Sequence, residues 1–206
     1  MNRIDIIQWF VNFLGAKTYL EIGVRNGESF FPIQCRNKIG VDIDLTVLPS
    51  EGETLFNMSS DDFFRYYPLR FDVAFIDGDH TYKQSLRDVE NCLNWMNPGG
   101  VIILHDCNPT QAEWATPEYV GASPYWCGEV WKTILTLRTD PSLSVHVFDT
   151  DFGVGVVMGG GQVSLSYYKG QVPLSYSRGQ INLMTYKDLD KNRDAFLNLV
   201  KDTREI

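Results

Sequence analysis

Acidic and imidazole side chains follow two short apolar stretches of this chain. Residues 73–76 and 101–104 are rich in branched apolar residues, a composition typical of buried parallel strands. The first stretch is followed by residues 77–80 (DGDH) and the second by residues 105–107 (HDC). Carboxylates and imidazoles that lie together can transfer a proton or bind a metal ion. These two groups of polar residues therefore predict a site for proton transfer or metal binding.

The elements around the two polar groups predict how they are positioned. A helix is expected between the strands, because apolar residues recur at spacings of three and four at Leu86, Val89, Leu93 and Met96. Residues 97–100 (NPGG) would end this helix. A strand, crossover helix and strand make a parallel pair, and an open α/β sheet binds its ligand at the carboxyl ends of such strands. We therefore expect both polar groups to face one crevice.

Size and charge exclude several classes of protein. With 206 residues, 44% of them hydrophobic, the chain can bury one sizeable core, and we expect a single domain over residues 1–206. The 18 Lys and Arg residues are outnumbered by 26 Asp and Glu residues, for a net charge of -8. A nucleic-acid groove needs a basic stripe, so no nucleic-acid partner is expected.

Cysteine spacing and hydropathy indicate a reduced, cytoplasmic protein. The 4 cysteines have no metal-binding spacing. No apolar stretch approaches the roughly 20 residues of a membrane span. Residues 3–14 are interrupted by polar residues and precede no signal-cleavage site, so we interpret them as an amphipathic helix on one face of the sheet.

The first predicted turn has the spacing of a ligand-binding loop. Residues 18–22 predict a strand, with Glu21 near its end and Gly23 and Gly27 in the turn that follows. Glycines permit a sharp bend and a close approach to a ligand. A helix predicted to begin near Glu28 would offer free N–H groups to an anion. Two glycines are also common in turns that bind nothing.

Asp42 ends the next predicted strand, residues 38–43, and follows Gly23 by 19 positions. That distance is close to the roughly 20 residues expected before an acid that binds ribose hydroxyls. Asp44 is a second candidate, and both acids could simply be solvated. Glu21 stands where a dinucleotide fingerprint has its first glycine. A carboxylate repels pyrophosphate and favours a cationic nucleoside.

A third turn, after a short strand at residues 54–56, would lie at the same edge of the sheet. Met58 and Ser59 could hold an adenine ring through an apolar contact and a hydrogen bond. Alternatively, Ser59 or Ser60 is the N-cap of a following helix and Met58 is a core residue.

The second half of the chain contains a long loop and an antiparallel pair of strands. Residues 108–124 predict a substrate lid, because loops of this length inside a domain are usually functional or disordered. A helix is expected over residues 129–137. Strands at 144–148 and 152–158 have so short a connection, residues 149–151, that they must be antiparallel.

A nine-residue repeat follows over residues 161–181, with glycine and glutamine starting each copy. Turn residues at this spacing predict a small β-meander, through which two copies of the chain could pair as a homo-oligomer, or a mobile appendage. The chain is predicted to end in a helix over residues 189–201.

Four segments together carry a resemblance to a known family: YLEIGVRNGESF, GVDID, FDVAFIDGDHTY and PGGVIILHDC. They resemble the class I S-adenosylmethionine-dependent methyltransferases, and more narrowly the branch of glycan and macrolide-sugar O-methyltransferases with a DGDH motif. The resemblance covers about residues 17–158. It implies an α/β, Rossmann-like three-layer sandwich with a seven-stranded, mostly parallel sheet whose last strand is antiparallel.

The resemblance also implies roles for individual residues. The cofactor-binding residues would be Glu21, Gly23, Gly27, Asp42 and Asp77, joined by Met58 and Ser59 from the third turn. His80 matches the general base of the macrolide-sugar enzymes, with Asp77 beside it as a catalytic residue.

Metal-dependent relatives bind magnesium through acids that map onto Asp77 and Asp106, with His105 as a third candidate ligand. Carboxylates suit Mg²⁺, whereas a histidine ligand shifts the preference toward Mn²⁺, iron or Zn²⁺. His105 and Cys107 both depart from the residues of these relatives, so the identity of the metal stays open.

The predicted function is O-methylation of a sugar hydroxyl by S-adenosylmethionine, aided by a divalent metal ion. Imidazole can accept the hydroxyl proton, and a metal ion can stabilise the alkoxide. A phenolic or amine acceptor stacked on Trp114, Tyr125 and Trp126 is the alternative within enzymes. A nucleoside-binding module without catalysis is the alternative outside them, with His80 capping a helix and His105 bonded in the core.

Overall fold

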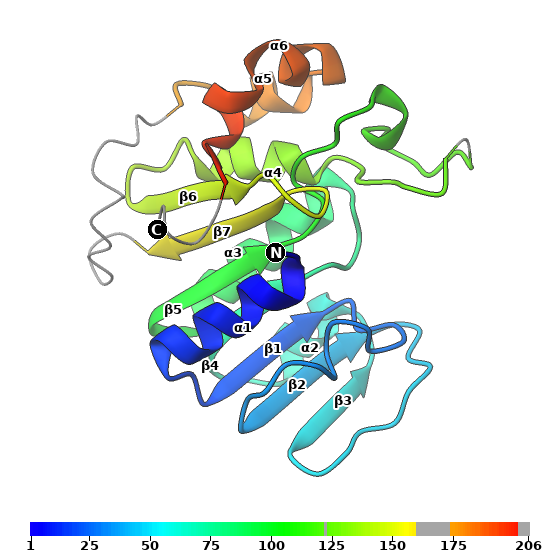
Figure 1. Ribbon diagram of the computed structural model, residues 1–206, viewed down its shortest axis with the longest axis vertical. Helices are drawn as coiled ribbons and strands as arrows, with labels where there is room; N and C mark the ends of the chain where they lie inside the picture. Colours follow the sequence, from blue (N-terminus) through cyan, green and yellow to red (C-terminus); the bar gives the residue numbers. More distant parts are fainter. Residues whose placement is uncertain (122, 160–173, 202–206) are drawn as a thin grey trace.

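The computed structural model describes residues 1–121, 123–159 and 174–201. Within these residues the strands form one sheet, in the order β3-β2-β1-β4-β5-β7-β6-β8 (Figure 1). The strands are β1 (Thr18–Ile22), β2 (Asn37–Asp42), β3 (Glu53–Asn57), β4 (Phe71–Ile76), β5 (Met96–Leu104), β6 (Leu143–Phe148), β7 (Val154–Gly159) and β8 (Leu199–Val200). The predicted parallel sheet with an antiparallel strand is confirmed, because β1 to β5 pair in parallel and β7 runs antiparallel to β5 and β6.

Helices cover both faces of the sheet and complete the predicted three layers (Figure 1). They are α1 (Arg3–Leu14), α2 (Ser60–Tyr66), α3 (Tyr82–Trp95), α4 (Val130–Leu137), α5 (Arg178–Asn182) and α6 (Tyr186–Leu197), with a 3₁₀ turn, η1 (Ala112–Trp114). Side chains alternate across each strand, so one core forms on either face. Val73 and Phe75 of β4 pack with α1, whereas Ala74 and Ile76 pack with α2, α3 and α4. None of the described helices has the length and apolar character needed to cross a bilayer.

The strand order creates the place where a ligand would bind. β1 lies between β2 and β4, so the chain leaves β1 toward one side of the sheet and later returns on the other side. Loops at the carboxyl ends of β1 and β4 therefore diverge, which leaves a crevice at this switch point. The polar residues that follow β4 and β5 both reach it, as the sequence predicts.

The prediction of a helix that begins near Glu28 is wrong. Residues 25–32 form turns, held by the Gly27 N–H donating to the Val24 carbonyl and the Phe31 N–H donating to the Gly27 carbonyl. Pro32 explains the difference, because it lacks an N–H and disfavours the helical conformation at the residue before it.

Two further predicted boundaries differ. Met96 begins β5 instead of ending the preceding helix, and it pairs with Phe71 of β4. The predicted helix over residues 189–201 is α6, which ends at Leu197. Asn198 is left-handed with φ 52°, and the chain then adds β8 beside β6. The sheet therefore has one short strand more than the seven that the resemblance implies.

The structure describes only part of the nine-residue repeat. Residues 161–173, which include the first copy and the start of the second, lie outside the described residues, so the pairing of two chains through this segment stays a prediction. The third copy belongs to helix α5, whose N-cap Ser177 forms a capping box with Gln180. Ile181 of this copy is fully buried in the core. A β-meander is therefore wrong for the third copy.

Candidate active site

A cavity of about 960 Å³ lies at the carboxyl ends of β1, β2, β4 and β5. Most of the residues predicted from the sequence line it, namely Gly23, Asp42, Met58, Ser59, Asp77, His80, His105 and Asp106. Two do not: Glu21, which is buried on β1, and Gly27, which belongs to the first turn. The cavity is thus shared by the predicted cofactor-binding residues and by the acid and imidazole groups.

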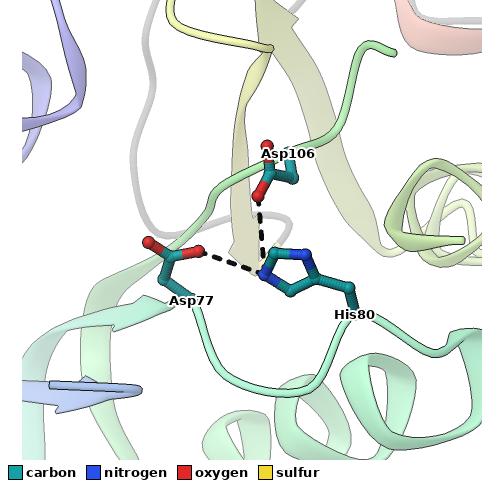
Figure 2. A group of neighbouring side chains, drawn as sticks. All are labelled: Asp77, His80 and Asp106. Carbon is teal, nitrogen blue, oxygen red and sulfur yellow. Dashed lines mark ion pairs between the residues drawn. The ribbon is translucent and has the colours of Figure 1, made fainter. Parts of the chain in front are cut away.

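Asp77, His80 and Asp106 bring three potential ligand atoms within 4.8 Å of one another (Figure 2). The Nε2 atom of His80 lies 3.4 Å from a carboxylate oxygen of Asp77 and 3.4 Å from one of Asp106. Two carboxylates and an imidazole nitrogen are a donor set that Mg²⁺, Mn²⁺ or Zn²⁺ can accept. These residues therefore fit a divalent cation.

The loop after η1 determines which nitrogen of His80 faces the cavity. Its Nδ1 atom donates to the Trp126 carbonyl over 2.9 Å, and its ring stacks on the Trp126 ring with 5.1 Å between centroids. Neutral imidazole then has its lone pair on Nε2, which faces the carboxylates. The side chain of Thr81, not that of His80, caps α3. The alternative in which His80 is a helix cap is therefore wrong.

The surroundings of His80 and Asp77 favour their charged forms. Burial by itself would lower the pKa of His80, but Asp77, Asp106 and the Trp126 carbonyl raise it. Burial likewise opposes ionisation of Asp77, yet the two histidines hold the pKa of this carboxyl far below its usual range. The Asp77 carboxylate is therefore ionised.

His105 links this cluster to the β6–β7 turn. Its Nδ1 atom lies 3.4 Å from Asp77 and 3.3 Å from Asp106, and its Nε2 atom lies 3.5 Å from Asp151. Burial lowers the pKa of His105, but these three carboxylates outweigh it and raise the pKa to about 12. The three-residue group contains His80, and His105 lies beside it against the same two carboxylates. The role of His105 as a metal ligand stays a prediction.

An unusual backbone conformation orients Asp106. Its φ is 58°, in the left-handed region that non-glycine residues seldom adopt. The residues that follow are held against the β6–β7 turn, because Cys107 N–H donates to Gly153 and Asn108 N–H donates to Phe152. The strain at Asp106 is maintained by this contact, as is common at functional sites.

The first turn approaches the end of β4 so closely that only glycine fits at position 23. Gly23 has φ 92°, and a Cβ added to it would lie 2.1 Å from the Asp77 carbonyl oxygen. Gly27 has φ 78° and closes the turn against the Phe31 ring. Both glycines are therefore required by the backbone conformation of the turn, independently of any ligand. Gly23 also lines the cavity, where its backbone is open to a ligand.

Glu21 supports the turn from behind and does not line the cavity. Its carboxylate accepts hydrogen bonds from the hydroxyl groups of Tyr19 and Ser29. Burial is the main reason why its pKa is raised to about 8, although both hydrogen bonds oppose the shift. Any effect of Glu21 on a ligand would pass through Ser29, which does line the cavity.

Asp42 ties the first two turns together. Its carboxylate accepts hydrogen bonds from the Arg25 N–H over 2.7 Å and from the Asp44 N–H over 2.8 Å. Asp44 lines the cavity as well, so both acids considered for ribose binding are available. Met58 lines the cavity and also packs on the core, while Ser59 lines it and also caps α2.

Several cavity residues were not predicted from the sequence. They include Arg3, Ile43, Gln84, Asp88 and Phe152. Asp88 had a detectable signal, because it precedes the apolar Cys92 by four positions and therefore lies on the same side of α3. Arg3 and Phe152 had none, since α1 and the β6–β7 turn meet the cavity only in three dimensions. Tyr125 and Trp126 line the cavity, whereas Trp114 packs behind them on Tyr125 and Phe152.

Comparison with known proteins agrees with this geometry. Residues 20–107 match a family model described as a methyltransferase domain. Similar solved structures include an S-adenosylhomocysteine-bound methyltransferase of Podospora anserina, with 15% identity and a TM-score of 0.59 over 77% of this chain and 78% of that one. The O-methyltransferase TomG of Streptomyces achromogenes has 12% identity and a TM-score of 0.58, over 77% and 80%. An O-methyltransferase of Bacillus cereus has 17% identity and a TM-score of 0.54, over 76% and 80%.

Identities this low establish a shared fold and nothing finer. The family match covers the first two turns, the acid and imidazole group after β4, and Asp106 after β5. Residues 20–107 thus resemble a methyltransferase domain, and the chain has the Rossmann-like α/β fold of these methyltransferases.

Proposed function

We propose that this protein transfers the methyl group of S-adenosylmethionine to a hydroxyl group, and that the acceptor is a sugar in a glycan or glycosylated metabolite. One observation carries the proposal: the Asp77, His80 and Asp106 group opens into the same cavity as Gly23 and Asp42. An acceptor hydroxyl could therefore meet a proton acceptor beside a bound cofactor.

The cavity suits a cationic nucleoside. Its volume of about 960 Å³ is at the upper end of the usual range for ligand pockets, about 300 to 1,000 Å³. Asp42 and Asp44 offer carboxylates to ribose hydroxyls, and Ile43 between them is 76% exposed, so it can cover one face of a purine. Acidic walls favour a sulfonium and repel the pyrophosphate of a dinucleotide.

Aromatic side chains beside His80 suit the acceptor. Tyr125, Trp126 and Phe152 line the cavity, and Tyr125 is 51% exposed. The apolar face of a sugar ring can stack on such rings while its hydroxyl groups reach the acids. A planar phenolic acceptor could use the same rings, which keeps it as the second candidate.

The proposed mechanism gives His80 the proton transfer. Its Nδ1 proton is held by the Trp126 carbonyl, so Nε2 is the nitrogen that can accept the hydroxyl proton. Asp77 and Asp106 flank this nitrogen and would stabilise the imidazolium that forms. The same two carboxylates would hold a divalent cation, which would stabilise the developing alkoxide. His80 has one free nitrogen, so it cannot ligate that cation and accept the proton at the same time.

Calorimetry and turnover assays test the proposal. S-adenosylhomocysteine should bind, and NAD should not. Methyl transfer should be detected with sugar acceptors in a panel that also contains catechols and amines. His80→Ala should leave S-adenosylhomocysteine affinity within about threefold and lower turnover at least about a hundredfold. Unchanged turnover would exclude His80 as the base, and transfer only to catechols would replace the sugar by the second candidate.

A further inference from the structure

We infer that Arg3, at the start of α1, binds the carboxylate of the methionine part of the cofactor. The inference rests on the proposed function, because it concerns how the same cavity holds S-adenosylmethionine. This ligand has a cationic sulfonium and a cationic amine, which acidic walls attract, and one carboxylate, which they repel. A site for it must therefore include a positive group near the methionine end.

The cavity offers few such groups. Its described lining includes 8 Asp and Glu residues and 2 arginines, Arg3 and Arg25. The histidines of the lining, His80 and His105, already face the carboxylates of Asp77 and Asp106. Arg25 belongs to the ribose side, since its N–H donates to Asp42 and its carbonyl accepts from Thr46. Arg3 belongs to the other side. The pKa of Arg3 is raised despite burial because Asp151 and Asp77 lie near its guanidinium group.

The first turn does not supply the positive end of a helix. Helix N-termini are common anion sites because their N–H groups lack partners, but no helix follows β1 within the described residues 23–36. The N–H groups of Gly23 and Gly27 are bonded to carbonyls. Those of Arg25 and Glu28 are bonded to the side chains of Asp42 and Asn26. These four N–H groups already have partners, so a side-chain cation would add to what this turn offers an anion.

Arg3 has the position and the spare donor for this role. Its side chain is 19% exposed, with Nη1 3.3 Å from Asp151 and Nη2 3.4 Å from Glu28. Its Nε atom is buried and has no hydrogen-bond partner in the structure. Glu28 is 70% exposed, so it can move aside at little cost. The backbone N–H of Arg3 donates to Asp151 over 2.8 Å, which anchors this end of α1 at the cavity.

The test compares two ligands that differ only in the carboxylate. S-adenosylhomocysteine has it, and decarboxylated S-adenosylhomocysteine keeps the adenosine, the sulfur and the amine. By calorimetry, the wild type should bind the first at least about tenfold more tightly, as expected for a charged hydrogen bond. Arg3→Gln should abolish most of this preference, and it should change the affinity for the decarboxylated ligand by less than about threefold. Arg3→Lys should restore part of the preference.

Each outcome has a distinct meaning. Arg178→Gln, an exposed arginine paired with Glu90 away from the cavity, is the matched control and should keep the full preference. If Arg3→Gln weakens both ligands equally, or neither, the inference is wrong although the proposed function stands. If the wild type binds neither ligand, the proposed function itself is wrong.

Discussion

The Nε2 atom of His80 lies 3.4 Å from the carboxylate of Asp106, although the two residues follow different strands, β4 and β5. Asp77 approaches the same nitrogen from the end of β4. The three side chains point toward one another from two loops, Asp77 and His80 from the loop after β4 and Asp106 from the loop after β5 (Figure 2). Several consequences of this convergence can be measured.

Asp106→Asn should abolish binding of Mn²⁺ or Mg²⁺ and lower turnover at least about a hundredfold, because an amide is a much weaker ligand for a hard cation. Affinity for S-adenosylhomocysteine should change little. Calorimetry with each cation and activity before and after chelation measure both effects. Asp140→Asn, in an exposed turn after α4, is the control. Full activity in chelator would show that the two carboxylates act without a metal ion.

Gly128→Ala should impair the position of His80. A Cβ at Gly128 would lie 2.4 Å from the His80 carbonyl oxygen, and its φ of 60° already disfavours alanine. We expect the free energy of unfolding to fall by about 1 to 3 kcal/mol. Turnover should decrease by a larger factor than cofactor affinity. Gly121→Ala is a matched control in the same loop, with φ 71° but open space around the added carbon. Equal losses of turnover in both variants would contradict a specific effect on His80.

Asp88 should make stability depend on pH. Burial is the main cause that raises its pKa to about 6 in the folded protein, compared with about 3.9 in an unfolded chain. Between these values the folded state binds more protons, so this residue lowers stability as the pH rises from about 4 to about 6. Asp88→Asn removes the cost of ionising a buried carboxyl group. The amide oxygen of asparagine can still accept hydrogen bonds from Ser60 and Gln84.

The gain in unfolding free energy from Asp88→Asn should therefore be close to zero at pH 4 and on the order of 2 kcal/mol above pH 7. Urea titrations of both proteins at the two pH values measure it. Asp62→Asn, whose side chain is 48% exposed, is the control. A gain that does not vary with pH would contradict the shifted pKa.

Tyr125→Ala should weaken binding of the acceptor without affecting binding of the cofactor. The ring is half exposed and lines the cavity beside Trp126 and Phe152. Loss of one stacking partner should raise the acceptor KM about 3- to 10-fold at unchanged S-adenosylhomocysteine affinity. Tyr66→Ala removes another exposed tyrosine ring, which lies outside the cavity, and should change neither value. A change in cofactor affinity alone would place Tyr125 at the other ligand.

The sequence by itself determined the sheet and the identity of its chemical edge. Strands such as residues 73–76 are continuous apolar runs, and this local pattern is sufficient to predict them. Parallel strands have their carboxyl ends on the same side, so Asp77, His80 and Asp106 had to converge once the strands were assigned.

Only the tertiary structure decided which of the remaining residues reach the cavity. The side chain of Glu21 does not line the cavity and instead accepts hydrogen bonds from the hydroxyl groups of Tyr19 and Ser29. Arg3 reaches it because α1 packs across the sheet and Asp151 anchors its first residue. The contact between Arg3 and Asp151 joins segments about 150 positions apart, and no periodicity within a short window encodes it. Hydrophobic pattern is a local property, whereas the approach of one element to another depends on how the whole core packs.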